Sequence, residues 1–176
     1  ESNFHVVDSE HRGLAALDAV TAIVIAEGYA TADTLSQALS CPVVAAFDSG
    51  NLLKVAQVLQ NKYPQKPIVI AGDDDLTQES INGKNPGKEK AMEAAQLVNG
   101  AVVLPIFAPG EQMSQQLSDF NDLANKSVLG IEAVKRQVGS VVEKVSQQAK
   151  QDSLLKLQVP IEPKQQEIKQ KRALVR

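Results

Sequence analysis

The chain has 176 residues, of which 43% are hydrophobic and 22% charged, and its formal net charge is -3. This length and composition indicate one folded domain, or one domain with an appendage, rather than global disorder, and the apolar stretches fall short of the roughly 18 residues that span a membrane. The single cysteine, Cys41, excludes an internal disulfide and a cysteine-based structural zinc site, so a reduced, cytoplasmic setting is expected.

Four short apolar runs follow one another along the chain and predict strands. They do not alternate with polar residues, so they indicate strands that are buried on both faces, as in a parallel sheet. Segments with helical spacing separate them, and Asn85-Pro86 provides a cap and a first residue for the last of these helices. This order predicts an α/β domain with right-handed crossovers. The strands are expected at residues 22–26, 43–47, 68–71 and 101–106.

The pattern changes after the fourth predicted strand. A short helix is predicted to begin at Ser118-Asp119, and apolar residues from Ile131 to Ala149 form a one-sided stripe that is typical of an amphipathic helix packed on the domain. Pro160 and Pro163 interrupt the chain before a remainder rich in Gln and Lys. We therefore predict a lead-in at 1–20, an α/β domain at 21–127, a packed helix at 128–150 and a tail or linker at 151–176.

Acidic residues directly follow the predicted strands. Glu27 and Gly28 follow the first, Asp48 follows the second, and Asp73 and Asp75 follow the third. Ligands bind at the carboxyl ends of the strands in an open parallel sheet, so these carboxylates are expected to converge there. Converging carboxylates repel one another unless a cation lies between them, and their oxygens favour Mg²⁺ or Mn²⁺.

The other acidic residues extend the same hypothesis. Asp73 and Asp75 are two residues apart, so in an extended segment their carboxylates share one side, while Asp74 points away. Asp119 and Asp122 lie on a segment that can return to this edge and are further candidate metal ligands. The alternative for each residue taken singly is a helix cap or a solvated turn.

The segment from Gly83 to Glu89 has a superficial likeness to a P-loop. Only three residues separate its two glycines, and Glu89 stands where the magnesium-binding hydroxyl is required. We therefore reject this assignment. Lys88 and Lys90 remain candidates for phosphate binding at a helix N-terminus, with two solvated lysines as the alternative. Gly28 is a third candidate, because a glycine in a tight turn lets the backbone approach a ligand; its alternative is an ordinary turn glycine.

Residues 68–77 resemble the first motif of the haloacid-dehalogenase-type phosphatases, a strand that ends in Asp-x-Asp-x-Thr. That resemblance implies Asp73 as nucleophile, Asp75 as general acid/base and a bridging magnesium ion. The phosphatases carry the motif on their first strand and a later acidic pair after another, whereas here it follows the third strand, and Glu27 has no role. This assignment is kept as an alternative.

A larger part of the chain, residues 21–122, resembles the Toprim domain of primases, topoisomerases, OLD-type nucleases and recombination mediators. Glu27-Gly28 matches its Glu-Gly motif, Asp73 and Asp75 match its Asp-x-Asp, and residues 119–122 are similar to an acidic stretch in primases. The resemblance is strongest to TraC-like primases and multidomain relaxases of conjugative plasmids. Its longer matching segments are FHVV, IAEGYATADTL, VVAAFDSGNL, VIAGDDD, NPGKEKA and DFNDLA.

The resemblance implies a Rossmann-like, four-stranded parallel sheet flanked by helices, with a C-terminal helical extension. It implies Mg²⁺-dependent (or Mn²⁺-dependent) nucleotidyl transfer in RNA primer synthesis, with the metal held by Asp73 and Asp75 and with Glu27 as a further ligand or general acid/base. The implied partners are nucleotide triphosphates, single-stranded DNA and other domains of a larger polypeptide, so the isolated domain is not expected to make primers efficiently. One position departs from the replicative primases, which carry Asp where this chain has Thr31, with Asp33 two residues on.

The distribution of charge leaves a second hypothesis open. Residues 164–176 carry a net charge of +4, and the first 163 residues carry -7, so the body does not bind nucleic acid by bulk electrostatics. Aromatic residues make up only 3% of the chain, so an extended platform for stacking bases is also poorly supported. The second hypothesis is a non-catalytic Toprim docking module that uses the basic tail.

Overall fold

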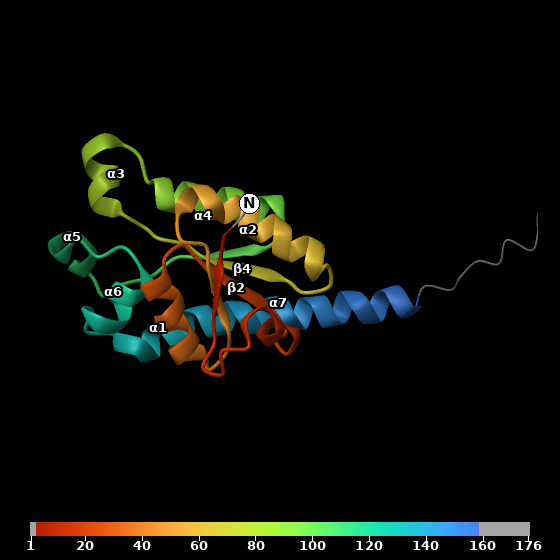
Figure 1. The fold of residues 1–176 in the computed structure, drawn as a ribbon. Helices are drawn as coiled ribbons and strands as arrows, with labels where there is room; N and C mark the ends of the chain where they lie inside the picture. Colours follow the sequence, from red (N-terminus) through yellow and green to blue (C-terminus); the bar gives the residue numbers. More distant parts are fainter. Residues whose placement is uncertain (1–2, 159–176) are drawn as a thin grey trace, which may run out of the picture.

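The computed structural model describes residues 3–158, in which a sheet lies between two layers of helices (Figure 1). The strand order is β1-β3-β2-β4-β5. The four strands predicted from the apolar runs are present and parallel to one another, which confirms the predicted α/β class. The strands are β1 (His5–Val7), β2 (Ile23–Ala26), β3 (Val43–Ala45), β4 (Ile68–Ala71) and β5 (Ala101–Val103).

Helices cover both faces of this sheet. Helices α1, α6 and α7 pack on one face, and α2 and α4 pack on the other. Within β2, for example, Val24 faces the first layer, and Ile23 and Ile25 face the second, so every residue of the strand is buried. The helices are η1 (Gly13–Asp18), α1 (Tyr29–Leu39), α2 (Ser49–Lys62), α3 (Leu76–Asn82), α4 (Pro86–Leu97), α5 (Glu111–Gln115), α6 (Phe120–Asn125) and α7 (Gly130–Gln158).

The fifth strand, β1, corrects the prediction of a four-stranded sheet. It pairs with β3 in antiparallel register, with Val6 opposite Val44, in a segment that the sequence suggested was only a lead-in. A run of three residues that begins with an exposed histidine is too short to give a strand pattern. Two predicted strands are also shorter than expected: β5 ends before Pro105, which has no N–H to donate, and β3 ends before Phe47, which adopts a left-handed backbone (φ 73°).

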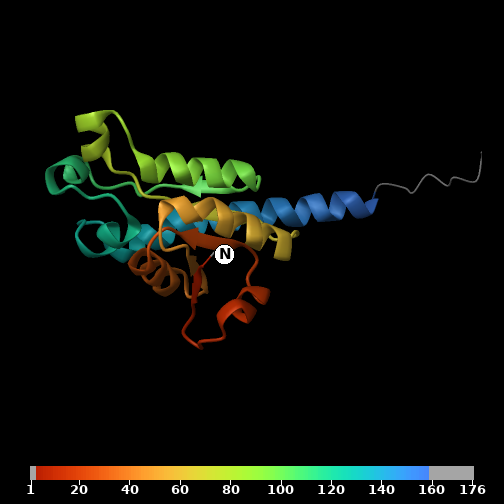
Figure 2. The same ribbon diagram turned by 45° about the horizontal axis from the view of Figure 1, so that its top comes forward.

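Helix α7 confirms the predicted amphipathic stripe. Ala133, Val134 and Val138 are buried against the sheet layer, whereas residues 151–157 are exposed. The helix runs through the predicted boundary at residue 150, and its C-terminal part extends beyond the other elements (Figure 2). The predicted tail after residue 158 lies outside the described residues. None of the described helices combines the length and hydrophobicity that a bilayer crossing requires.

The carboxyl ends of the central strands lie level with one another. Ala26 at the end of β2 is in register with Ala45 of β3 and with Ala71 of β4. Helix α1, which follows β2, and helix α4, which follows β4, lie on opposite faces of the sheet. The chain therefore diverges between β2 and β4: after these two neighbouring strands it leads to helices on opposite faces of the sheet. Open α/β sheets bind their ligands at such a position.

Candidate functional site

Two carboxylates flank the point where the chain diverges between β2 and β4. Glu27 directly follows β2, and Asp73 lies two residues after the end of β4. Close packing of α4 holds the segment after β4: a Cβ at Gly72 would lie 2.5 Å from the Cβ of Ala91, and one at Gly87 would lie 3.0 Å from that of Asp73. Glycine at both positions therefore lets the start of α4 lie directly against Asp73.

Asp73 carries the strongest electrostatic perturbation at this site. Burial, followed by the negative charges of Glu27, Asp119 and Asp122, raises its pKa to about 7. Its Oδ1 atom is buried and has no hydrogen-bond partner among the described residues. A buried carboxylate oxygen without a donor is costly, so Asp73 is suited to accept a proton or to bind a cation.

Glu27 shares this environment. Burial is the largest cause that raises the pKa of Glu27, and the charges of Asp48 and Asp119 add to it, against a hydrogen bond from the Ser49 backbone. Glu27, Asp73 and Asp119 therefore form the centre of an acidic cluster, because each of the first two is perturbed by the other acids. Asp48 and Asp122 lie at its margins.

Three of the predicted ligands also act as helix caps. The side chains of Asp48, Asp75 and Asp119 accept hydrogen bonds from the backbone N–H of Asn51 (2.8 Å), Gln78 (2.8 Å) and Asp122 (2.7 Å), respectively. They thus satisfy the first turns of α2, α3 and α6. Asp122 in turn accepts a hydrogen bond from the Ser118 backbone (3.0 Å) and pairs with Lys126 (2.7 Å).

Asp75 differs from Asp119 in its electrostatic coupling to Asp73. It is absent from the charges that raise the pKa of Asp73. The chain turns into α3 immediately after residue 75, where the carboxylate of Asp75 caps the helix. The cap geometry depends on the backbone angles of this turn, which the residue spacing alone does not reveal.

The acid between them, Asp74, is held by α4. Its Oδ1 accepts a hydrogen bond from the side chain of buried Asn85 (2.8 Å) and lies 3.5 Å from the Nζ of Lys88. The amide of Asn85 also donates to Glu79 (2.9 Å). The predicted cap is confirmed, since the Oδ1 of Asn85 accepts from the Lys88 backbone N–H. The sequence does not predict its link to Asp74, because the two residues are eleven positions apart and helix α3 lies between them.

The two lysines predicted to bind phosphate are both engaged with acidic side chains. Lys88 pairs with Asp74, and Lys90 pairs with Glu93 at 2.6 Å on the same helix. Phosphate binding by either lysine would therefore compete with an existing ion pair.

Thr31 lies within the acidic cluster, although it is not itself acidic. It is 3% exposed, and its hydroxyl donates a hydrogen bond to Oδ2 of Asp119 (3.1 Å). Asp33 instead accepts a hydrogen bond from the side chain of Gln37 (2.8 Å) on the outer side of α1. The hydroxyl thus orients the carboxylate of Asp119. This role was not predicted, because it depends on the approach of α6 to α1.

The acidic cluster has part of the donor set that a metal ion requires. Within residues 3–158, no three His, Cys, Asp or Glu side chains are arranged to hold a metal by themselves. The unpaired Oδ1 of Asp73 and the neighbouring Glu27 instead fit the usual magnesium pattern, in which one or two carboxylates act with water and substrate phosphates. The donor set therefore fits a hard cation that is bound together with a phosphate substrate.

Comparison with known proteins gives matches to one domain family and to two curated relatives. The family model of the Toprim domain matches residues 22–128. One protein called DNA primase TraC from Escherichia coli is 38% identical over 207 residues, covering 86% of this chain and 14% of that protein. Another of the same name and organism is 39% identical over 229 residues, covering 98% of this chain and 21% of that protein. The chain thus spans only a minor part of these curated relatives. No solved structure gives a significant match.

Proposed function

The chain belongs to the Toprim domain family, and from this premise we propose that it is the nucleotidyl-transfer domain of a primase-like protein. The observation that carries the proposal is the pairing of Glu27 with Asp73 across the point where the chain diverges. Asp73 has an unpaired carboxylate oxygen there and a pKa raised to about 7. The predicted family and its likeness to primases are confirmed by the comparisons.

Magnesium, when bound, would supply positive charge that orients a nucleotide triphosphate and offsets the charge of the transition state. Asp73 and Glu27 would hold it, with Asp119 and Asp75 as further ligands. Thr31 fixes the orientation of Asp119 through its hydroxyl. Burial raises the pKa of Glu27 above the ordinary value of a glutamate, which favours a role as general acid/base.

The context of the domain is part of the same proposal. We propose that it acts within a longer polypeptide, whose other domains bring single-stranded DNA and nucleotide triphosphates to the acidic cluster. Primer synthesis in plasmid replication and conjugation, by a primase or a relaxase with such a domain, is the process that this assignment fits. The proposed location is the cytoplasm, and the isolated domain is proposed to bind metal without making primers efficiently.

Calorimetric titration with Mn²⁺ tests the metal site. We expect the wild-type chain to bind Mn²⁺ and Asp73→Ala to lose this binding, because Asp73 provides the unpaired oxygen. Asp75→Asn keeps a good helix cap but removes a carboxylate, so it shows whether Asp75 is a ligand. Asp152→Asn, on the exposed end of α7, is the matched control and should bind as the wild type does. Absence of binding by the wild type, or unchanged binding by Asp73→Ala, would overturn the proposal.

A non-catalytic docking module is the second candidate, and the capping roles of Asp48, Asp75 and Asp119 favour it. In that case the acids serve the fold, Mn²⁺ does not bind, and removal of residues 164–176 abolishes partner or DNA binding. The phosphatase alternative fits less well. It assigns acid/base chemistry to Asp75, which caps α3, and gives no role to Glu27. It requires turnover of an aryl phosphate that Asp73→Asn abolishes and Glu27→Gln leaves intact.

A further inference from the structure

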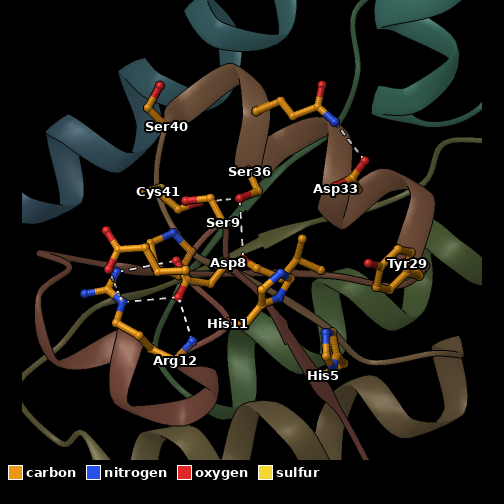
Figure 3. Close-up of a pocket in the computed structure, with 14 residues that line it drawn as sticks. His5, Asp8, Ser9, His11, Arg12, Tyr29, Asp33, Ser36, Ser40 and Cys41 are labelled. Atoms are coloured by element: carbon orange, nitrogen blue, oxygen red, sulfur yellow. Dashed lines mark hydrogen bonds and ion pairs between the residues drawn. The ribbon is translucent and has the colours of Figure 1, made fainter.

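A pocket of about 530 Å³ lies between β1, the loop that follows it and the outer side of α1 (Figure 3). We propose that this pocket binds an unpaired nucleobase, which stacks on Tyr29. The volume falls within the range of small-molecule sites. The proposal concerns residues that the metal site does not use.

Aromatic rings form one wall of the pocket. Tyr29 is 51% exposed, and its ring lies 5.7 Å from that of His5, tilted by 40°. His11 lines the same hollow and lies between His5 and Asp8 in Figure 3. A half-exposed ring at the rim of a cavity offers a free π-face, and stacking on such a face tolerates any base. A single base needs one such ring, so the low aromatic content of the chain does not exclude this site.

Polar groups on α1 form the neighbouring wall. Asp33 and Gln37 lie one helical turn apart, and the amide of Gln37 donates to the carboxylate of Asp33 (2.8 Å). A carboxylate accepts hydrogen bonds from the exocyclic amino and ring N–H groups of bases. Gln37 presents its own carbonyl oxygen beside it. These groups match the polar edge of a base whose face lies on Tyr29.

The charge of the pocket favours a base over a phosphate group. Its one guanidinium, that of Arg12, already contacts two carboxylates, those of Asp8 (3.2 Å) and Glu10 (3.1 Å). When Asp33 is counted as well, the pocket lining carries three carboxylates and one arginine. This surplus of negative charge repels a phosphate anion but does not repel a neutral, planar base. Tyr29 lies two residues after Glu27, so a base held here leaves its sugar and phosphates free to extend toward the acidic cluster.

Fluorescence of 2-aminopurine tests this pocket, because the chain contains no Trp that would interfere. The 176-residue chain is titrated, in EDTA, into 2-aminopurine riboside and separately into single-stranded oligo-dT that contains one 2-aminopurine. We expect stacking to quench the fluorescence in at least one of these titrations. Quenching of the riboside alone identifies a free nucleotide as the source of the base, and quenching of the oligonucleotide alone identifies single-stranded DNA.

Variants then locate the binding. Tyr29→Leu is expected to weaken it by about tenfold or more, and Tyr29→Phe to retain it, because the ring supplies the stacking. Phe47→Leu is the matched control: Phe47 is similarly exposed (53%) but does not line the pocket, so binding should be unchanged. Circular dichroism confirms that each variant folds. No quenching by the wild type, no effect of Tyr29→Leu, or an equal loss in Phe47→Leu would overturn the proposal.

The metal variant separates this inference from the proposed function. Asp73→Ala is expected to abolish Mn²⁺ binding and to leave the quenching in EDTA unchanged, because Asp73 does not line the pocket. Loss of quenching in Asp73→Ala would contradict a separate pocket. Failure of Mn²⁺ binding in the wild type, with quenching retained, would contradict only the proposed nucleotidyl transfer.

Discussion

At the scale of a single residue, Asp73 is the clearest case of a side chain that suits the proposed chemistry but destabilises the metal-free fold. The end of β4 leads its carboxyl group to a position where water is scarce and three other acids lie near, and no donor within residues 3–158 reaches its Oδ1. Such an arrangement does not stabilise the metal-free fold. We interpret this cost in folding stability as a sign that the site is complete only when a cation is bound.

The cost is measurable as a dependence of stability on pH. The pKa of Asp73 is about 7 in the folded chain, against about 3.9 in an unfolded one. Between these values the folded chain keeps a proton that the unfolded chain has lost, so ionisation of Asp73 removes stability as pH rises from about 4 to about 7. In EDTA, Asp73→Asn is therefore expected to be more stable than the wild type at pH 8, by on the order of 3 kcal/mol, with little gain at pH 4.

Urea unfolding of both proteins at the two pH values provides the measurement. Asp75→Asn is the control, since it makes the same chemical change two residues away and retains a capping side chain. A similar gain in unfolding free energy for this control, or no gain for Asp73→Asn at pH 8, would show that ionised Asp73 is not the source of the lost stability.

The residues of the site differ in how far the sequence predicts them. Glu27 and Asp73 follow buried runs, so the topology of a parallel sheet is enough to bring them together. Asp75 and Thr31 could not be assigned in the same way. The role of Asp75 depends on the backbone angles of one turn, and that of Thr31 depends on the contact between α1 and α6. Spacing along the chain contains neither kind of information.

At the scale of elements, two threonines join α1 to α6. Thr31 donates to Asp119 (3.1 Å), and Thr34, one turn further along, donates to the Oδ1 of Asn121 (2.9 Å). Both threonines are largely buried, at 3% and 7% exposure. They form a matched pair, because one acceptor is a carboxylate of the acidic cluster and the other is a neutral amide.

Replacing each threonine by valine separates the two roles. Thr31→Val is expected to cost about 2 kcal/mol of unfolding free energy and Thr34→Val about 1 kcal/mol, because a hydrogen bond to a charged group is the stronger one. Mn²⁺ affinity should fall only in Thr31→Val, since only that change releases Asp119. Urea unfolding and calorimetric titration measure the two effects, and equal Mn²⁺ affinity in both variants would contradict this role for Thr31.

The elements themselves were predictable to different degrees. β2 and β4 bury every residue, and such continuous apolar runs are evident in the sequence. Helices α3 and α5 were not predicted, because they are short and lack a regular apolar stripe; α3 has no buried residue at all. Short elements are stabilised by caps and tertiary contacts rather than by periodicity, so patterns detect them poorly.

At the scale of the whole molecule, α7 divides into a packed part and an exposed part. Its side chains up to Ser146 contact the domain, where the hydroxyl of Ser146 donates to that of Thr21 (3.0 Å). Residues 151–157 are exposed. We therefore predict that the residues of α7 after 150 contribute little to the stability of the domain.

Truncation tests this boundary. A chain that ends at residue 150 is expected to unfold within about 0.5 kcal/mol of the full chain, because it loses only exposed side chains. A chain that ends at residue 129 loses Val134 and Val138 from the core and is not expected to fold stably. Thermal unfolding followed by circular dichroism compares the three lengths, and a large loss from the first truncation would place the boundary further along α7.

The short strand β1 has a consequence for how this molecule behaves among other copies of itself. Without it, β3 would present unpaired backbone groups to solvent along a fully apolar strand, which is a template for association between molecules. β1 pairs with these backbone groups of β3. The two edge strands, β1 and β5, have three residues each, so they expose few unpaired backbone groups. β1, which contributes no ligand to the acidic cluster, is therefore expected to protect the domain from aggregation by covering this edge of β3.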